Sequence, residues 1–167
     1  MKLKKLAHNV INFGTNRVIE IFGVAVLLAG VFLIASLITF SPDDPNFIFP
    51  NNGEIKNIFG FHGSFTADIF LQSFGLIALL IPLTLMVSGT NIILHKKIFI
   101  ILESIFYTIL YSLLGSLFFS FFYPTAFKLY INGNGGFIGK YLETTFLISI
   151  ININSEIFYY QFCFHFL

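Results

Sequence analysis

Charged residues are scarce in this chain, and their scarcity argues against a soluble fold. Only 10% of the 167 residues are Asp, Glu, Lys or Arg, whereas soluble domains contain roughly 25%. With 56% hydrophobic residues, a soluble protein would have too few polar side chains to cover its surface. The net charge is +1 and no basic stripe occurs, so the composition gives no sign of nucleic-acid binding.

Tryptophan is absent and cysteine occurs once. The single cysteine, Cys163, excludes an intrachain disulfide and a zinc site built from cysteines. The four histidines are scattered and no pair has metal-ligand spacing. Neither a G-x-S-x-G nor a His-Glu-x-x-His motif occurs. The sequence therefore predicts no catalytic residue, no metal site and no cofactor.

Long uncharged stretches are abundant instead. Residues 21–40 carry no charge, and twenty helical residues reach about 30 Å, the thickness of a bilayer's hydrocarbon core. Residues 69–94, which are also uncharged, and residues 98–122, in which Glu103 is the one charged residue, form two further apolar spans. Residues 144–167 are a weaker fourth candidate, because Asn152, Asn154 and Glu156 interrupt them. We expect an all-α integral membrane protein with three transmembrane helices and this fourth span; an interfacial or poorly inserted tail is the alternative for 144–167.

The domain organisation follows from these spans. Residues 1–20 form a basic head and residues 21–167 a membrane domain, with longer connections at 41–68 and 123–143. The head and the short turn at 95–97 carry six Lys and Arg residues, and the two longer connections carry three. Because Lys and Arg are enriched on the cytoplasmic side, we expect the N-terminus in the cytoplasm and the longer connections outside. We therefore expect the chain to cross the membrane several times.

Small residues on the third span predict close helix packing. The face consists of Ser112, Gly115, Ser116 and Ser120. Packing within one bundle is favoured over a homo-oligomer. In the second span, Pro82 is expected to kink the helix.

Few residues within the spans could carry chemistry. Glu103 lies close enough to the cytoplasmic end of the third span to reach the surface, and the sequence assigns no role to Glu156. Residues 134–141 come near a phosphate-binding loop, G-x-x-x-x-G-K-[ST]. Asn134 and Tyr141 stand at its first and last positions, so this segment is not an ATP site.

Several short motifs follow one another in a fixed order. A Ser-Pro-x-Asp-Pro turn comes after the first span, and a Gly-x-x-Gly-x-x-x-Ala-Asp segment leads into the second. That second span carries Phe-Gly and a proline, and a Gly-Gly-x-x-Gly segment follows the third. The positions are Ser41, Pro42, Asp44, Pro45, Gly60, Gly63, Ala67, Asp68, Phe74, Gly75, Pro82, Gly135, Gly136 and Gly139. This order resembles the N-terminal four-helix membrane region of FtsK/SpoIIIE-type DNA translocases.

The resemblance implies a non-catalytic membrane anchor and interaction domain in a bacterial inner membrane, with a role in cell division and chromosome segregation. Its partners would be the lipid bilayer, proteins of the division septum and further copies of itself, without direct contact to nucleic acid. The family's ATP-driven motor is absent from this chain, which has no Walker motif. A small transport or channel subunit and a degenerate gene fragment remain the alternatives.

Overall fold

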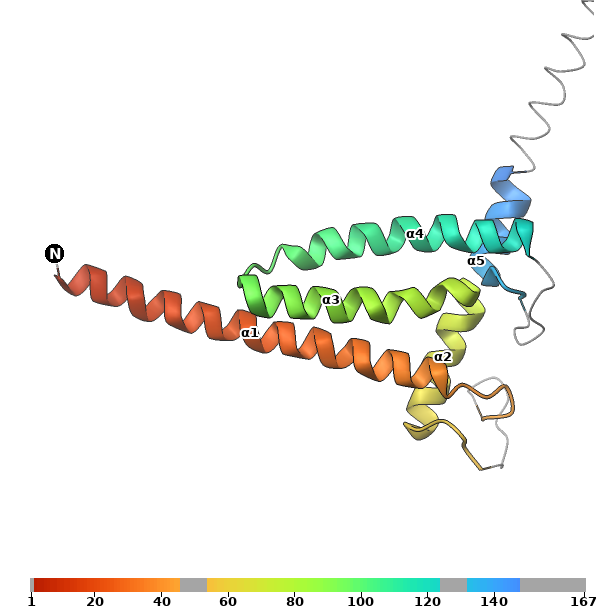
Figure 1. Cartoon of the computed structure of the whole chain (residues 1–167), viewed down its shortest axis with the longest axis horizontal. Coiled ribbons are helices and arrows are strands. Elements are labelled where there is room, and N and C mark those ends of the chain that lie inside the picture. The colour runs from red at the N-terminus through yellow and green to blue at the C-terminus, as the bar shows by residue number, and fades with distance from the viewer. Residues whose placement is uncertain (1, 46–53, 124–131, 148–167) are drawn as a thin grey trace, which may run out of the picture. The chain divides into compact units, whose positions relative to one another are not determined.

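The computed structural model describes residues 2–45, 54–123 and 132–147, and all regular structure in these ranges is helical. Three stretches are long and apolar enough to cross a membrane: Val10–Ile38, Gly60–His95 and Ile100–Phe122. This confirms the expected all-helical membrane protein with three spans. The elements are α1 (Lys2–Ile38), α2 (Gly60–Phe74), the 3-10 helix η1 (Gly75–Leu79), α3 (Leu80–His95), α4 (Ile100–Phe122), α5 (Gly136–Leu142) and the π-helical turn η2 (Glu143–Leu147) (Figure 1). Most of the fourth expected span, residues 148–167, lies outside the described residues.

Helix α1 begins much earlier than the first apolar span does. It runs without interruption through the basic head, so its 37 residues measure roughly 55 Å at 1.5 Å per residue. That length exceeds the hydrocarbon core of a bilayer by more than 20 Å. The head is therefore a helical continuation of the first span.

The described residues form two compact units. The first unit contains Met1–Phe70 and Ala78–Ser112, and with them α1, α3 and the first parts of α2 and α4. The second unit contains Leu71–Ile77 and Leu113–Leu167, with the end of α2, the second part of α4, and α5.

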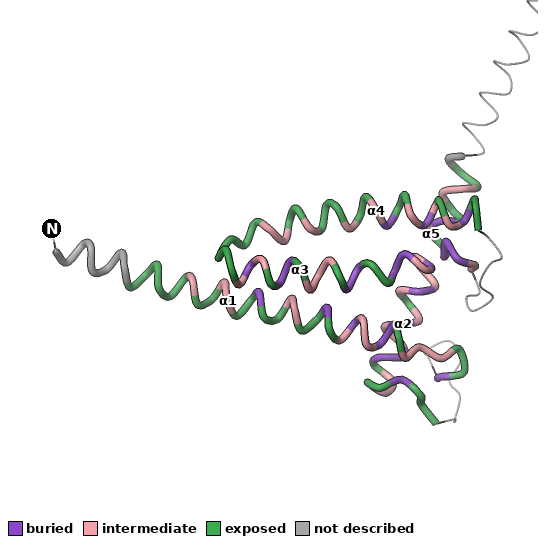
Figure 2. The backbone as a smooth tube through the Cα atoms, viewed as in Figure 1, coloured by how far each residue is buried: buried purple, intermediate pink, exposed green. Residues whose placement is uncertain are grey.

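In the first unit, α1 packs along α3 through glycines (Figure 1). A Cβ atom at Gly89 of α3 would lie 2.6 Å from the backbone nitrogen of Leu27. A Cβ atom at Gly30 of α1 would lie 2.9 Å from the carbonyl oxygen of Pro82. Without side chains at these positions the two backbones approach closely, which is how helices associate in lipid. The buried positions alternate with exposed ones along both helices (Figure 2).

A short turn joins α3 to α4 in the same unit. Lys96 ends α3 in the left-handed conformation, with φ of 55°, and its N–H donates to a carbonyl in the last helical turn. Hydroxyl groups then link the two helices: Ser88 Oγ donates to Ser104 Oγ at 2.5 Å, and Thr84 and Tyr111 share a hydrogen bond of 2.9 Å. Such pairs satisfy polar groups that lipid cannot hydrogen-bond.

The second span is interrupted before it reaches Pro82, the residue at which a kink was expected. Gly75 has φ of +64° and opens the 3-10 segment Gly75–Leu79, after which α3 starts afresh at Leu80. Pro82 therefore lies in the first turn of a new helix. There its missing N–H disrupts no helical hydrogen bond.

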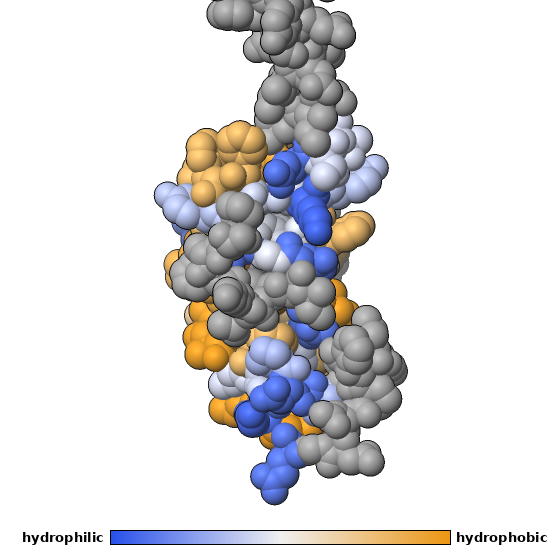
Figure 3. All heavy atoms as spheres, turned by 90° about the vertical axis from the view of Figure 1, so that its right-hand side faces the viewer, coloured by the Kyte–Doolittle hydropathy of each residue, from blue (hydrophilic) through white to orange (hydrophobic). Residues whose placement is uncertain are grey.

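Polar residues concentrate in the connections. Asp43, Glu54 and Lys56 are exposed in the described parts of the connection between α1 and α2. Figure 3 views the molecule from the right-hand side of Figure 1, and hydrophilic atoms in blue are visible there beside hydrophobic ones.

Candidate functional site

Two groups of polar and small residues stand out because each ties together chain segments that are distant in sequence. The first, which we call the aspartate cluster, lies in the first unit and consists of Ser36, Asp44, Asn57 and Gly63. The second, which we call the glycine–serine cluster, lies in the second unit. It consists of Phe74, Gly75, Ser116, Ser120, Asn134, Gly135, Gly136, Gly139 and Glu143. Most of the motif positions singled out in the sequence fall in or beside these clusters.

Asp44 is the centre of the aspartate cluster. Its side chain is buried, with 4% of the residue exposed. One carboxylate oxygen accepts the N–H of Lys56 and the other accepts the N–H of Asn57, both at 2.9 Å. Two backbone donors thus compensate for the burial of a charge. The neighbouring Asp43 is exposed and only pairs with the Lys56 ammonium group at 3.1 Å.

Asn57 connects the end of α1 to the start of α2. Its side-chain amide donates to the carbonyl oxygen of Ser36 at 2.8 Å, and its Oδ1 accepts the N–H of Phe59 at 3.1 Å. The second contact is a turn that starts α2. A Cβ atom at Gly63 would lie 2.0 Å from Asn57 Oδ1, so this position has no room for a side chain.

The glycine–serine cluster supplies hydrogen-bond partners to backbone groups at the helix break at Gly75. A break inside a helix leaves backbone groups without helical partners, and lipid offers none. Ser116 of α4 donates its hydroxyl to the carbonyl oxygen of Phe74 at 3.0 Å. The N–H of Leu76 donates to the carbonyl oxygen of Asn134 at 2.9 Å. Two other segments of the chain therefore satisfy groups that the break sets free.

Asn134 is fully buried at the centre of this cluster. Its side-chain amide donates to the carbonyl oxygen of Tyr123 at the end of α4. Its Oδ1 is buried and has no hydrogen-bond partner among the described residues. The same residue accepts the N–H of Leu76 through its backbone, so it links the connection after α4 to the helix break.

Glycines let the segment after α4 lie directly on the α4 backbone. A Cβ atom would lie 2.4 Å from the Ser116 carbonyl oxygen at Gly135, and 2.2 Å from it at Gly139. At Gly136, where φ is +65°, a Cβ would lie 2.5 Å from the Gly75 nitrogen. Ser120 adds a hydrogen bond of 2.5 Å to the Glu143 carboxylate.

The predicted packing face of the third span is thus occupied within the chain. Ser116 and Ser120 are buried, and a Cβ atom at Gly115 would lie 2.5 Å from the Ile77 side chain. Ser112 is buried too, but its Oγ finds no hydrogen-bond partner among the described residues. An oligomer would have to use a surface other than Ser116 and Ser120.

The remaining motif positions are spread over the first unit. Ala67 of α2 is completely buried, and Asp68 beside it is half-buried. In the turn after α1, Ser41 is half-buried, Pro42 is exposed and Pro45 is buried. Gly60 has φ of +61° at the start of α2, with open space around it.

The ionisable groups of the described residues do not gather into a reactive site. Glu103 is exposed on α4 and Asn91 is half-buried on α3, while Glu156 lies outside the described residues. No group of three His, Cys, Asp or Glu side chains among the described residues could hold a metal ion. At the near match to a phosphate-binding loop, the space above Gly135 and Gly139 is filled by the α4 backbone.

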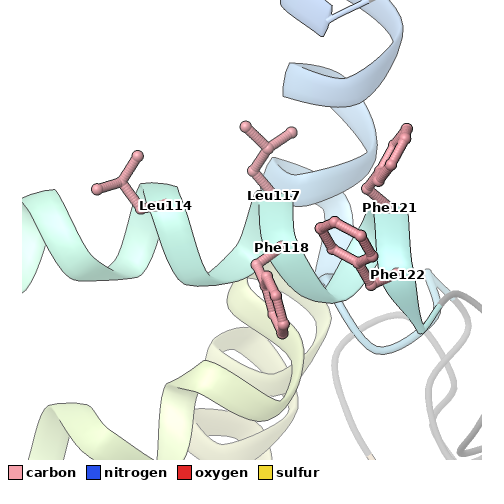
Figure 4. Close-up of a pocket in the computed structure, with 5 residues that line it drawn as sticks. All are labelled: Leu114, Leu117, Phe118, Phe121 and Phe122. Atoms are coloured by element: carbon pink, nitrogen blue, oxygen red, sulfur yellow. The ribbon is translucent and has the colours of Figure 1, made fainter.

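A shallow hollow on α4 is entirely apolar. Figure 4 shows its lining residues, which are Leu114, Leu117, Phe118, Phe121 and Phe122. These side chains offer neither hydrogen bonds nor charges. The hollow is suited to hydrocarbon contact and not to a polar substrate.

Sequence reasoning missed the residues that hold the clusters together. Asn57, Asn134 and Glu143 were not among the predicted site residues. The available signal was their chemistry: amide and carboxylate side chains beside glycines in an otherwise apolar chain. Such groups are costly in lipid unless they satisfy particular partners.

Comparison with known proteins identifies the family. The sequence profile described as the 4TM region of DNA translocase FtsK/SpoIIIE matches residues 15–162. The DNA translocase FtsK of Rickettsia bellii is 36% identical over 69 residues, which cover 40% of this chain and 9% of that protein. That of Mesorhizobium japonicum is 34% identical over 77 residues, which cover 45% of this chain and 9% of that protein. That of Shewanella oneidensis is 30% identical over 97 residues, which cover 58% and 10%.

The matches lie in one part of these relatives. The chain spans about a tenth of their length, and the matched region is their non-catalytic membrane domain. No solved structure is significantly similar to the chain. The profile covers residues 15–162, nearly the whole sequence. The chain therefore belongs to the FtsK/SpoIIIE 4TM family.

Proposed function

We propose that this chain is the membrane anchor and interaction domain of an FtsK-like DNA translocase, acting in cell division and chromosome segregation. The observation that carries the proposal is the family match over residues 15–162. The matched relatives are named DNA translocases, and the region they share with this chain is a membrane region. ATP hydrolysis and DNA movement are not part of the role proposed for these 167 residues, which contain no Walker motif.

The proposed location is a bacterial inner membrane, crossed several times with the N-terminus in the cytoplasm. The distribution of Lys and Arg supports this orientation. Arg17 and Lys96 both pair with Glu20, which groups basic side chains at the end of the unit where α3 turns into α4. The connections after α1 and α4 then face outward.

In the proposed mechanism, the chain acts by holding its two longer connections in fixed positions at the membrane. The aspartate cluster fixes the connection after α1, and the glycine–serine cluster fixes the one after α4. Both connections are thereby held in defined conformations at their described ends, where they can present surfaces to proteins of the division septum. Copies of the chain would associate through helix faces that the two clusters leave free.

Septal localisation tests this proposal. A fluorescent protein fused to the N-terminus should concentrate at midcell in dividing cells of the native host. A single-span membrane protein with the same fluorescent tag, at equal expression, is the control and should label the whole envelope. An even distribution of the fusion around the envelope would reject the septal role while leaving the membrane assignment intact.

A further inference from the structure

The second candidate span is longer than one crossing of a bilayer needs. Gly60–His95 contains 36 residues. As one straight helix it would measure roughly 54 Å at 1.5 Å per residue, whereas the hydrocarbon core of a bilayer is about 30 Å thick. The break at Gly75 divides this stretch into α2 and α3. The two helices are therefore free to take different directions in the membrane.

Helices α1 and α3 run antiparallel and match residue for residue. Three pairs mark levels at which they touch: Lys96 with Glu20, Gly89 with Leu27, and Met86 with Gly30. From one pair to the next, the step along α3 equals the step along α1. Lys96 belongs to the turn between α3 and α4, and both of these helices belong to candidate spans. The level of Lys96 and Glu20 therefore marks one surface of the membrane.

The connection that contains α2 starts and ends at the same level of this helix pair. When the matching continues, Leu80 at the start of α3 lies level with Ser36 of α1. The other end of the connection lies there too, because the Asn57 amide donates to the Ser36 carbonyl oxygen at 2.8 Å and the Phe59 and Phe32 ring centres are 4.7 Å apart. A helix between two points at one depth lies along the membrane plane. Figure 1 shows the first part of α2 running crosswise to α1 and α3.

This level lies close to the opposite surface of the membrane. From Glu20 to Ser36 the rise is about 24 Å at 1.5 Å per residue, within a hydrocarbon core about 30 Å thick. Ser36 is therefore roughly 6 Å below the boundary between acyl chains and headgroups, and helices that lie in the membrane plane are buried to roughly 5–10 Å at this boundary. The exposed pair of Asp43 and Lys56, beside the start of α2, indicates water just beyond this level.

Helical periodicity gives the first part of α2, residues 60–70, three sides. One side is buried in the fold, where Ser64 and Ala67 are 1% and 0% exposed. At about 100° of rotation per residue, the outer sides carry one apolar and one polar row. The apolar row consists of Phe61, Phe65 and Ile69. The polar row consists of His62 and Thr66.

The apolar row continues the lipid contact of the spans. The half-buried rings of Phe61 and Phe65 are parallel, with 6.2 Å between their centres, and Ile69 is 46% exposed. At about the same level of the membrane, Ile38 of α1 and Leu80 of α3 are 71% and 46% exposed. These apolar side chains belong to helices that face lipid, so the row on α2 extends an existing contact with the bilayer.

We propose that the first part of α2 is an in-plane helix at this surface of the membrane, with the apolar row among the acyl chains and the polar row toward headgroups and water. Lipid is favoured over a second copy of the chain because the row lies at the depth of the acyl chains and joins the lipid contact of α1 and α3. The aspartate cluster sets this depth, since it ties the start of α2 to the end of α1. The inference does not depend on the proposed septal role.

The depth of single tryptophans tests the proposal, because the chain has no tryptophan of its own. Phe61→Trp, Phe65→Trp and Ile69→Trp are each reconstituted, in the full chain, in phosphatidylcholine vesicles whose acyl chains are brominated at one depth. An in-plane helix places the three indoles at the same depth, whereas a crossing helix would separate the first from the last by about 12 Å. We expect equal quenching at the three positions, strongest with bromine near the headgroups.

Controls come from the crossing helix α3 and from the polar row. Leu83 and Leu94 of α3 are 45% and 68% exposed, and tryptophans at these two positions should differ in depth by about 16 Å. The exposed His62 reports on the polar row. The emission of His62→Trp should be quenched by acrylamide from the water and not by brominated acyl chains.

Three outcomes overturn the proposal. A depth that changes steadily from position 61 to position 69 would make α2 part of a crossing helix. No quenching by brominated lipid at any of the three positions would mean that the apolar row does not contact acyl chains. Quenching that falls as the protein density in the vesicle rises would assign the row to a second copy. Ile69 is exposed, so Ile69→Trp keeps the test valid where a phenylalanine variant does not fold.

Discussion

At the scale of single residues, glycines and amides decide where this apolar chain can bend. Gly75 has φ of +64°, and a Cβ atom there would lie 1.9 Å from the Asn134 carbonyl oxygen. Any side chain at position 75 therefore meets both backbone strain and a clash with backbone. Gly60 has nearly the same φ, +61°, but open space around it. Substitutions at positions 60 and 75 therefore separate the effect of backbone strain, which both share, from the effect of steric overlap, which occurs only at position 75.

Gly75→Ala should destabilise the protein strongly and Gly60→Ala only mildly. A left-handed alanine costs about 1–2 kcal/mol, and the forced backbone shift at position 75 adds about 1–3 kcal/mol more. The measurement is the free energy of unfolding in mixed micelles titrated with sodium dodecyl sulfate. Equal losses for the two variants would mean that Asn134 does not lie against the break.

Asp44→Asn should weaken the connection after α1, whereas Asp43→Asn should not. The Asp44 carboxylate accepts two backbone N–H groups in a buried setting, and loss of one such charged acceptor costs about 1–3 kcal/mol. The exposed pair between Asp43 and Lys56 is worth at most about 1 kcal/mol. Limited proteolysis of the connection in detergent should be faster only in Asp44→Asn. Equal protection in both variants would contradict the proposed role of Asp44.

The sequence analysis reached some of these residues but not their partners. The motif order pointed to Asp44, Gly63, Gly75 and the glycines at 135–139, but it gave no partner for the carboxylate of Asp44. Its partners are backbone N–H groups twelve and thirteen residues away. Almost every residue type has a backbone N–H group, so the sequence gives no sign of which residues donate to Asp44. Sequence pattern alone therefore could not identify the partners of this carboxylate.

At the scale of helices, close contact between α1 and α3 depends on missing side chains. Gly23 and Gly89 approach so closely that a Cβ atom at position 89 would lie 2.7 Å from the Gly23 carbonyl oxygen. In lipid, this contact replaces the hydrophobic effect as a source of helix association.

Gly89→Leu should separate α1 from α3, and Val87→Leu is the matched control on the exposed side of α3. Val87 is 60% exposed, so a leucine there should change stability little. At position 89 the added volume should cost about 1–3 kcal/mol. The unfolding free energy in mixed micelles is again the measure. A Gly89→Leu protein as stable as Val87→Leu would show that the two helices do not pack through Gly89.

Hydropathy predicted the long helices because a long run of apolar residues is enough to identify a membrane-spanning helix. It placed the start of the first span at residue 21, since it detects the apolar stretch and not the helical continuation before it. It also attributed the bend of the second span to Pro82, the strongest local breaker. The structure puts the break at Gly75 because Ser116 and Asn134 satisfy the freed backbone groups there, and that depends on segments distant in sequence.

At the scale of the whole molecule, the orientation in the membrane is the next prediction. In a Cys163→Ser background, Lys97→Cys should react with a membrane-impermeant maleimide only from the cytoplasmic side. Glu54→Cys should react only from the outside. Both positions are exposed, so accessibility within the fold does not limit labelling. Labelling of Lys97→Cys in intact spheroplasts would invert the proposed topology.

The central claim is that this chain can serve as the membrane region of a DNA translocase. The most direct test fuses it in place of the membrane region of an FtsK protein whose own region has been deleted, in cells that need that protein to divide. We expect the fusion to gather at the septum and to restore chromosome segregation, and we expect Gly75→Ala in the fusion to do neither. A stable fusion that spreads evenly over the membrane and leaves segregation defective would contradict the proposed function.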